Sequence, residues 1–216
     1  MSLVFYFSPF STASITEAVL AELGIACERV QLDIQAGATR EAAYLAVNPN
    51  GRVPAIVHDG TAIWESAAIT MYLGEVFGVA AHLYPAPGPR RGEAMKWIVW
   101  SSVTLAEAGA RLSASSPEGS EGAVEPGSRD WVPPEQRSAG ALERAKADLA
   151  TSLGILDGAL EGKPFLLGEY SLTDTHLQVL VGLFDAMGID LTAYSNVVGW
   201  MRRCAERPRL AELTAP

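Results

Sequence analysis

The stretch "NPNGRVPAI", residues 48–56, decides the fold of this chain. Its second proline, Pro54, opens a run of apolar and β-branched residues that predicts a strand. Proline donates no backbone N–H and is normally kept out of the centre of a sheet. Pro54 is therefore expected at the start of the strand, and the flanking sequence indicates why it is there.

The residues before this stretch predict a strand, a helix and a second strand. "LVFYF", residues 3–7, is aromatic and β-branched without a helical period, which is typical of a short buried strand. From Ser14 apolar residues recur at intervals of three and four, and Gly24 follows as a helix C-cap. "CERVQLD", residues 27–33, alternates as a second strand, and residues 37–48 predict a short irregular helix. A βαβ unit followed by a helix therefore leads into residues 48–56.

The residues after Pro54 predict an antiparallel hairpin and another helix. In "PAIVHDGTAIWES" the pair Asp59-Gly60 separates two apolar runs, which is a hairpin signal. A helix is expected to begin at Ser66, which is a good first residue. Gly78 is expected to lie just past its end. Residues 1–80 thus predict a βαβαββα domain.

The second part of the chain is predicted to be all-helical. Residues 81–89 are rich in proline and predict a linker, and residues 90–216 predict a helical domain. Helices are expected over residues 92–112, 138–162, 171–188 and 195–213, the third opened by a variant capping box, "SLTD", and the last stopped near Pro208. Residues 113–137 form a long connection of Ser, Gly, Pro and Glu, either a mobile surface loop or a lid anchored by Trp131.

Composition limits the function classes. The chain has 216 residues and a formal net charge of −9, which disfavours nucleic acid and anionic membranes as partners because both need a positive field. Residues 1–10 do not show the basic start and unbroken apolar stretch that a secretory signal would have, and no apolar run approaches the ~20 residues of a membrane-spanning helix. We therefore expect a cytoplasmic protein.

Cysteine and histidine give no sign of a metal site. The two cysteines are far apart and outside any Cys-x-x-Cys pair, so both are expected to be packed thiols. The three histidines have no partner pattern and are expected to be structural or exposed. These residues are Cys27, Cys204, His58, His82 and His176.

Four motifs together carry a resemblance to a known family. "SPFST" follows the first strand, "NPNGRVPAI" precedes the hairpin, "ES" opens the third helix, and "SLTD" opens a late helix. In this order, with an all-helical second half, the chain resembles the glutathione S-transferase family in its bacterial soluble form, along essentially its whole length. The resemblance implies a thioredoxin-like N-terminal domain, a helical-bundle C-terminal domain and a homodimer. It also implies glutathione as co-substrate and no metal.

The resemblance implies which residues hold glutathione. Pro54 is expected to have a cis bond, which would turn the backbone of Val53 outward so that it can pair with an extended peptide, as an added strand would. Ser66, at a helix N-terminus, suits the γ-glutamyl carboxylate, and Glu65 suits the ammonium group. Arg52 is expected to pair with the glycyl carboxylate.

The thiol needs a hydroxyl that favours its ionised form. An ordinary thiol has a pKa of about 8.5, and a hydrogen bond at a helix N-terminus lowers it. Ser11 looks like the catalytic serine of serine-type members, while Thr12 and Ser14 are alternatives because the register of the turn is open. Tyr6, inside the first strand, is expected to be core.

The second substrate is expected where the two domains meet. Five residues are the candidates for an apolar pocket, although ordinary helix packing is the competing interpretation for the two tryptophans. They are Phe10, Trp97, Trp100, Ser101 and Leu105.

The predicted function is conjugation of glutathione to small hydrophobic electrophiles, a detoxification reaction. No cysteine lies near the first turn, which disfavours disulfide exchange. One alternative is a non-catalytic binding or assembly protein, because fold does not fix function. Another is a glutathione-dependent isomerase, dehalogenase or peroxidase.

Overall fold

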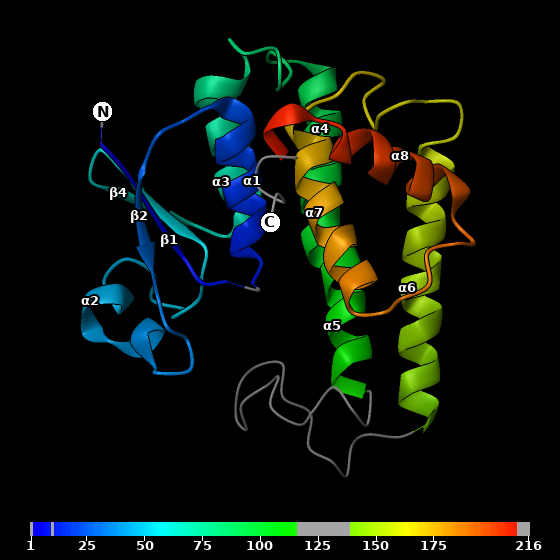
Figure 1. Cartoon of the computed structure of the whole chain (residues 1–216), viewed down its shortest axis with the longest axis horizontal. Coiled ribbons are helices and arrows are strands. Elements are labelled where there is room, and N and C mark those ends of the chain that lie inside the picture. The colour runs from blue at the N-terminus through cyan, green and yellow to red at the C-terminus, as the bar shows by residue number, and fades with distance from the viewer. Residues whose placement is uncertain (1, 10, 116–138, 211–216) are drawn as a thin grey trace.

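A computed structural model of the chain describes residues 2–9, 11–115 and 139–210. A small sheet lies on one side, α1 and α3 lie next to it, and the helices of the C-terminal half form the other side (Figure 1). The N-terminal half contains β1 (Leu3–Phe7), α1 (Ala13–Leu23), β2 (Glu28–Gln31), the 3₁₀ turn η1 (Ala38–Arg40), α2 (Ala42–Leu45), β3 (Ala55–His58), β4 (Thr61–Trp64), α3 (Ser66–Leu73) and the π-helical η2 (Gly74–Gly78). The C-terminal half contains α4 (Pro89–Trp100), the π-helical η3 (Ser101–Leu105), α5 (Ala106–Ser115), α6 (Ala139–Ala159), α7 (Leu172–Ala186) and α8 (Ser195–Ala205).

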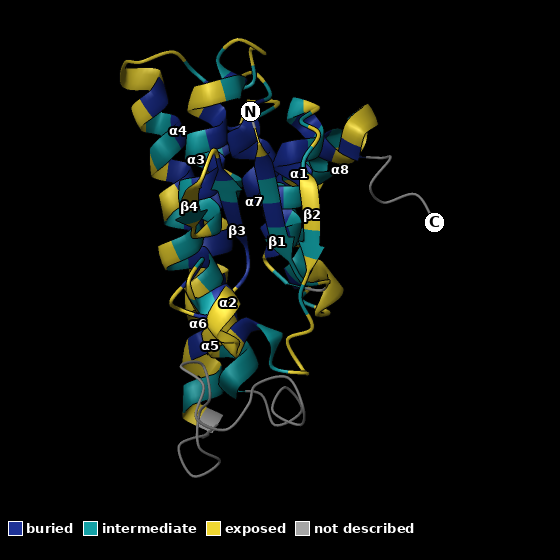
Figure 2. Ribbon diagram, turned by 90° about the vertical axis from the view of Figure 1, so that its left-hand side faces the viewer, coloured by how far each residue is buried: buried dark blue, intermediate teal, exposed yellow. Residues whose placement is uncertain are grey.

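The sheet confirms the predicted order of elements. Its four strands run β2-β1-β3-β4, with β1 parallel to β2 and both other pairs antiparallel. The inner strands β1 and β3 are more buried than the outer strands (Figure 2). Tyr6 pairs with Ala55, and Ala55 pairs with Trp64. The end of β1, the start of β3 and the end of β4 therefore lie at one edge of the sheet.

The predicted turns are present. Asp59 and Gly60 join β3 to β4 with φ values of 46° and 83°, and two positive φ values in a two-residue hairpin are those of a type I′ turn. Gly24 ends α1 in the left-handed conformation, with φ 64° and ψ 33°. The helix itself begins at Ala13, one residue before the start of the apolar period at Ser14, and its N-cap is Thr12.

Two helices that the sequence predicts as continuous contain a π-helical turn. The predicted helix over 66–78 becomes η2 at Gly74, where the Val79 N–H donates to the carbonyl five residues back. The helix predicted over 92–112 contains η3, where the Ser101 hydroxyl donates to the Ile98 carbonyl at 2.7 Å. A serine that bonds to a carbonyl of the preceding turn competes with the helical N–H donors, which fits the local widening.

The linker tyrosine lies against η2. A methyl group added at Gly74 would lie 2.7 Å from Cγ of Tyr84, and one added at Gly78 would lie 2.9 Å from its Cβ. Both distances are shorter than side-chain contacts allow, so only glycine leaves room for this side chain. Tyr84 is 4% exposed and belongs to the core of the N-terminal half.

Two helix starts in the C-terminal half differ in how well the sequence predicts them. α4 begins at Pro89, inside the predicted linker, because proline suits the first helical position, where its missing N–H is not needed. The capping box of α7 is confirmed, with the Ser171 N–H donating to Asp174 Oδ2 at 3.0 Å. Asp174 also accepts from the Leu166 N–H and from Trp200 Nε1, each at 2.9 Å. This carboxylate therefore joins α7, α8 and the segment between α6 and α7.

Polar contacts tie the two halves together. The Thr70 hydroxyl of α3 and His176 Nδ1 of α7 are 2.8 Å apart, and both side chains are fully buried. Glu22 of α1 accepts from the Arg207 guanidinium at 2.9 Å and 3.3 Å. The Glu22 side chain is 0% exposed and that of Arg207 is 36% exposed, so the ion pair is buried on one side.

The two cysteines, Tyr6 and the end of α8 lie as the sequence predicts. Cys204 is buried and Cys27 is half-buried against the N-terminal core, so the prediction of packed thiols is confirmed. Tyr6 is half-buried and packs against the same core. α8 ends at Ala205, before Pro208. Residues 113–115 belong to α5, while the remainder of the predicted loop or lid, including Trp131, lies outside the described residues. No helix of the described part is both long and apolar enough to cross a bilayer.

Candidate functional site

The register of the sheet brings three predicted motifs to one edge. Val53 and Pro54 immediately precede Ala55 at the start of β3, and Glu65 and Ser66 immediately follow β4. The turn that carries the candidate hydroxyls follows β1 at the same edge, because Tyr6 pairs with Ala55. Neighbouring strands lie about 4.8 Å apart, so these segments are neighbours in space.

The backbone at Val53 is the central feature of this edge. The peptide bond between Val53 and Pro54 is cis, as expected. Neither the N–H nor the C=O of Val53 has a hydrogen-bond partner among the described residues. β1 pairs with β3 only from Ala55 onward, so these two groups can bond to an added extended chain.

Two side chains that the sequence interpretation missed hold the preceding residue. The carbonyl of Arg52 accepts from the Tyr44 hydroxyl at 2.6 Å and from Asn48 Nδ2 at 2.6 Å. Both donors are 3% exposed, and burial raises the pKa of Tyr44 to about 12. Arg52 itself is an exposed residue. Asn48 stands in the quoted stretch, so the motif contained a signal, but nothing local indicated that it bonds to a carbonyl four residues away.

The start of α3 presents polar groups at this edge. Glu65 is exposed and has a φ of 71°, unusual for a residue with a side chain. Ser66 is the first residue of α3 and is half-buried, and no side chain caps this helix. The N–H groups of its first turn and the Ser66 hydroxyl form a helix N-terminus that favours a carboxylate.

The three candidate hydroxyls have different surroundings. The Ser11 hydroxyl donates to the Ser8 carbonyl at 2.7 Å and accepts from the Ala13 N–H at 3.2 Å. The Ser14 hydroxyl donates to the Ser11 carbonyl at 2.9 Å. Thr12 is exposed, and its hydroxyl has no hydrogen bond to any described residue. Ser11 is thus the hydroxyl that the helix N-terminus holds in place.

The residues predicted for the apolar pocket divide into two groups. Ser101 and Leu105 are both 0% exposed, so their side chains belong to the core and offer no surface to a ligand. Trp97 is 8% exposed and also joins the core of the C-terminal half, as the competing packing interpretation expected. Trp100 is half-buried, with its ring edge-on to that of Trp97 at 5.2 Å. Phe10 lies outside the described residues.

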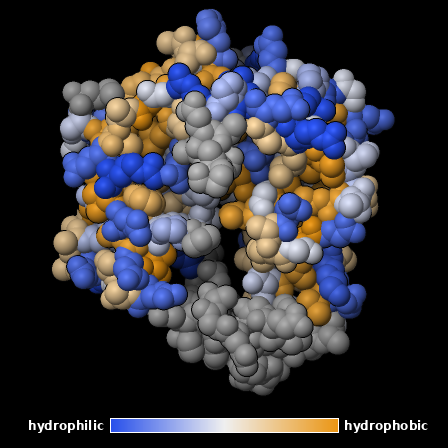
Figure 3. All heavy atoms as spheres, viewed as in Figure 1, coloured by the Kyte–Doolittle hydropathy of each residue, from blue (hydrophilic) through white to orange (hydrophobic). Residues whose placement is uncertain are grey.

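An apolar cavity borders the predicted hydroxyl turn from a different side. A volume of about 320 Å³ lies between α1 and α7, and its lining includes Ser14, Ala18, Val179, Gly182 and Leu183. Hydrophobic residues lie on both sides of the hollow between the two halves (Figure 3). Ser14 thus belongs both to the turn and to this cavity. The sequence interpretation missed the α7 side because Val179 and Leu183 follow the ordinary spacing of a core-facing helix.

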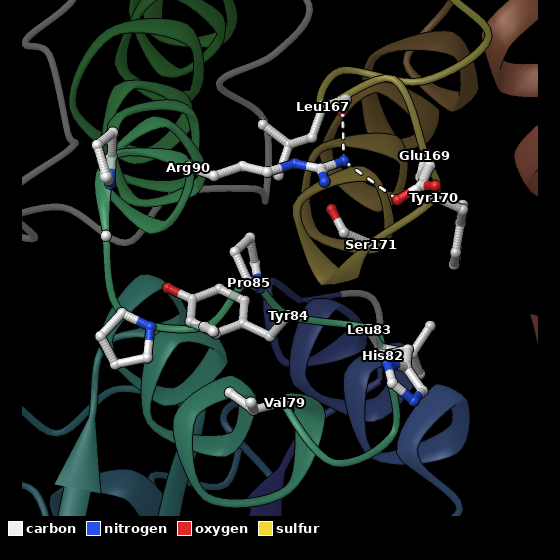
Figure 4. A pocket seen from close by; sticks show the side chains of 14 residues that line it. Val79, His82, Leu83, Tyr84, Pro85, Arg90, Leu167, Glu169, Tyr170 and Ser171 are labelled. Carbon is white, nitrogen blue, oxygen red and sulfur yellow. Dashed lines mark hydrogen bonds and ion pairs between the residues drawn. The ribbon is translucent and has the colours of Figure 1, made fainter.

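The larger groove lies elsewhere, at the linker. It has a volume of about 550 Å³ and contains none of the residues predicted for the site. Arg90 reaches across from α4 and donates to the Leu167 carbonyl at 2.9 Å and to Glu169 at 3.2 Å, opposite the linker residues Tyr84 and Pro85 (Figure 4). This groove is therefore separate from the sheet edge.

The histidines match the expectation of structural or exposed residues. His58 Nδ1 is 2.6 Å from the Tyr72 hydroxyl, His176 is buried beside Thr70, and His82 is exposed on the linker. Within the described ranges no group of three or more His, Cys, Asp or Glu side chains could hold a metal ion.

Family models match both halves of the chain. The model of the glutathione S-transferase N-terminal domain matches residues 2–75, and the model of the C-terminal domain matches residues 123–208. The chain belongs to the glutathione S-transferase family. The thioredoxin-like sheet followed by a helical half is the architecture of this family, as the sequence predicted.

Individual members are similar over nearly their full length. Glutathione S-transferase GstB of Escherichia coli K12 is 27% identical over 197 residues, covering 90% of this chain and 88% of that protein. The ternary complex of BphK, a bacterial transferase, is 25% identical with a TM-score of 0.78, covering 97% of this chain and 96% of BphK. The transferase URE2P6 from Phanerochaete chrysosporium, in complex with oxidized glutathione, has a TM-score of 0.83 at 22% identity, covering 98% and 94% of the two chains.

Proposed function

We propose that this family member binds glutathione at the sheet edge and conjugates it, through its sulfur, to small hydrophobic electrophiles. The observation that carries the proposal is the unpaired backbone of Val53, which lies between the uncapped start of α3 and the hydroxyl turn before α1. A tripeptide with a thiol at its centre can bond to all three. Solved relatives support this ligand, among them a sphingomonad transferase complexed with glutathione that is 25% identical.

Each polar group of glutathione has a proposed partner. The cysteinyl residue pairs with the N–H and C=O of Val53, as an added strand would. The γ-glutamyl carboxylate binds at Ser66, where the helix N-terminus stabilises a negative charge, and Glu65 holds the ammonium group. Arg52 supplies a positive charge to the glycyl carboxylate, which offsets repulsion from a chain of net charge −9.

The Ser11 hydroxyl is proposed to stabilise the thiolate. Its oxygen is anchored by the Ala13 N–H, so only the hydroxyl proton has to turn from the Ser8 carbonyl to the sulfur. A lowering of the thiol pKa by one unit is worth about 1.4 kcal/mol. The thiolate then attacks an electrophilic carbon: a carbon–sulfur bond forms, the leaving group departs with its bonding electrons, and the thiol proton passes to solvent.

The electrophile is proposed to bind in the cavity between α1 and α7. Its volume of about 320 Å³ is suited to a small apolar molecule, and Ser14 places it beside the turn that carries Ser11. A methyl group added at Gly182, which lines the cavity, would lie 3.9 Å from Met201 Cε, an ordinary van der Waals contact, so a side chain can be introduced into this wall. Gly182→Leu is expected to raise the KM for an aryl chloride and leave glutathione affinity unchanged. Gly154→Leu, on an open face of α6, is the matched control.

Binding and turnover are tested separately. Calorimetry with glutathione should show saturable binding, and an activated aryl chloride should be consumed in its presence. Ser11→Ala is expected to lower kcat roughly tenfold, the equivalent of one pKa unit of the thiol, with little change in affinity. Thr12→Val and Ser14→Ala are controls, and a larger loss in either would reassign the role.

Other outcomes separate the alternatives. Ser66→Ala should weaken glutathione binding, and an unaltered dissociation constant would reject that contact. Binding of glutathione without turnover of any electrophile would indicate a binding protein rather than an enzyme. That alternative has one observation in its favour, because the Ser11 and Ser14 hydroxyls both donate to carbonyls within the turn.

A further inference from the structure

The carbonyl of Arg52 is held more firmly than its place in a surface loop requires. It accepts two hydrogen bonds of 2.6 Å, from the Tyr44 hydroxyl and from Asn48 Nδ2. Both donor side chains are 3% exposed, so water does not compete strongly for them. We call these two donors the carbonyl clamp.

The loop around the clamp is itself fixed. Asn48 Oδ1 accepts from the Asn50 N–H at 3.1 Å and from its side-chain amide at 3.0 Å, so the orientation of the Asn48 amide is set. The Gly51 N–H donates to the Asn48 carbonyl at 2.9 Å. The Tyr44 ring packs against Tyr6 of β1 at 5.5 Å, which ties the second donor to the sheet.

The clamp sets the direction of the neighbouring N–H. The bond between Arg52 and Val53 is trans, and in a planar trans amide the N–H points away from the C=O. Because two buried donors hold the oxygen on the inner side, the Val53 N–H is directed to the opposite side. That N–H is the group with no partner among the described residues.

We propose that Tyr44 and Asn48 are positioning residues, which hold the Val53 N–H ready for the cysteinyl carbonyl of glutathione. This inference rests on the proposed function and assigns a part of it to residues that do not touch the ligand. A donor fixed in advance is not ordered again on binding, so the clamp acts on affinity. Its removal should therefore change the dissociation constant for glutathione rather than the pH profile of turnover.

The first test removes one donor at a time. Tyr44→Phe keeps the ring and its packing, and Asn48→Asp keeps the acceptor that Asn50 uses while replacing the donor. Each is expected to weaken glutathione binding about threefold to tenfold by calorimetry, as for the loss of one ordinary hydrogen bond. Tyr72→Phe is the matched control, because the Tyr72 hydroxyl bonds to His58 at 2.6 Å in α3, away from the clamp.

A second ligand separates positioning from a structural effect. In an analogue of glutathione with a trans carbon–carbon double bond in place of the cysteinyl-glycine amide, no carbonyl is left for the Val53 N–H. We expect Tyr44→Phe to weaken glutathione binding but to leave the affinity for the analogue within about twofold. The inference would be overturned if Tyr44→Phe lost affinity equally for both ligands, or lost none for glutathione. In either case, binding of glutathione by the wild-type protein would still support the proposed function. Failure of the wild-type protein to bind glutathione would instead refute the proposed function.

Discussion

The buried histidine between the two halves makes stability depend on pH in a defined window. His176 is fully buried, one ring nitrogen bonds to Thr70, and the other has no partner among the described residues. Burial lowers the pKa of His176 from its ordinary value of 6.5 to about 3. Below pH 6.5 the unfolded chain therefore binds a proton that the folded protein does not accept. Stability is fully present above pH 6.5 and falls as the pH drops toward 3.

The size of the effect follows from the two pKa values. Between them the free energy of unfolding falls by up to about 1.4 kcal/mol per pH unit. Lowering the pH from about 8 to about 5 should then remove roughly 2 kcal/mol. Most carboxylates remain ionised over this range, so their contribution is small.

Urea unfolding at several pH values between 8 and 5 measures this slope. His176→Asn removes the titrating ring, and its free energy of unfolding should be nearly independent of pH over the same range, whatever its absolute value. His58→Gln is the control, since it also removes a histidine bonded to a hydroxyl. Equal slopes for the wild type and His176→Asn would refute the reasoning.

Three further substitutions test the packing between helices. Asp174→Ala leaves several buried donors unpaired and should lower the free energy of unfolding by about 4 kcal/mol in urea; a loss below 1 kcal/mol would contradict the role of this carboxylate. Arg207→Met should lower it by roughly 2 kcal/mol, less than for a fully buried pair because the arginine is partly exposed, and adding Glu22→Gln should recover part of the loss. In Gly109→Ala the new methyl would lie 2.3 Å from a ring carbon of Phe184 in α7, so the free energy of unfolding should fall. Gly158→Ala has open space around the new methyl and should raise the free energy of unfolding by about 1 kcal/mol.

The sequence predicts best what is encoded locally. The Asp59-Gly60 turn, the Gly24 cap and the Ser171 capping box each depend on the chemistry of a few adjacent residues, and all are present. The predicted start of α4 was wrong because Pro89 was assigned to the proline-rich linker, although proline also suits the first helical position. The π-helical turns have no comparable local signal, and the tyrosine that packs against Gly74 and Gly78 of η2 comes from the linker.

Motifs predicted the cis bond at Pro54 and the helix start at Ser66, whereas the burial of other candidate residues depends on long-range packing. Trp97, Ser101 and Leu105 are spaced by four, so one buried helix face carries all three, and the same spacing could have placed the last two in the core. The clamp on Arg52 was not foreseen, because it depends on where the hydroxyl of Tyr44 ends in space. Which of Ser11, Thr12 and Ser14 faces the sulfur stays a prediction for the substitutions to decide.

The seating of Tyr84 between Gly74 and Gly78 bears on how this chain can be recombined with its relatives. A crossover placed between residues 78 and 84 would separate the ring from the two glycines that make room for it. To keep this packing, the parent protein that supplies the N-terminal half must supply residues up to Tyr84. The parent that supplies the C-terminal half must carry a leucine at the position of Leu172, which also packs near Gly78. In the construction of chimeric transferases, the junction should therefore lie after Tyr84 and not between Gly78 and Tyr84.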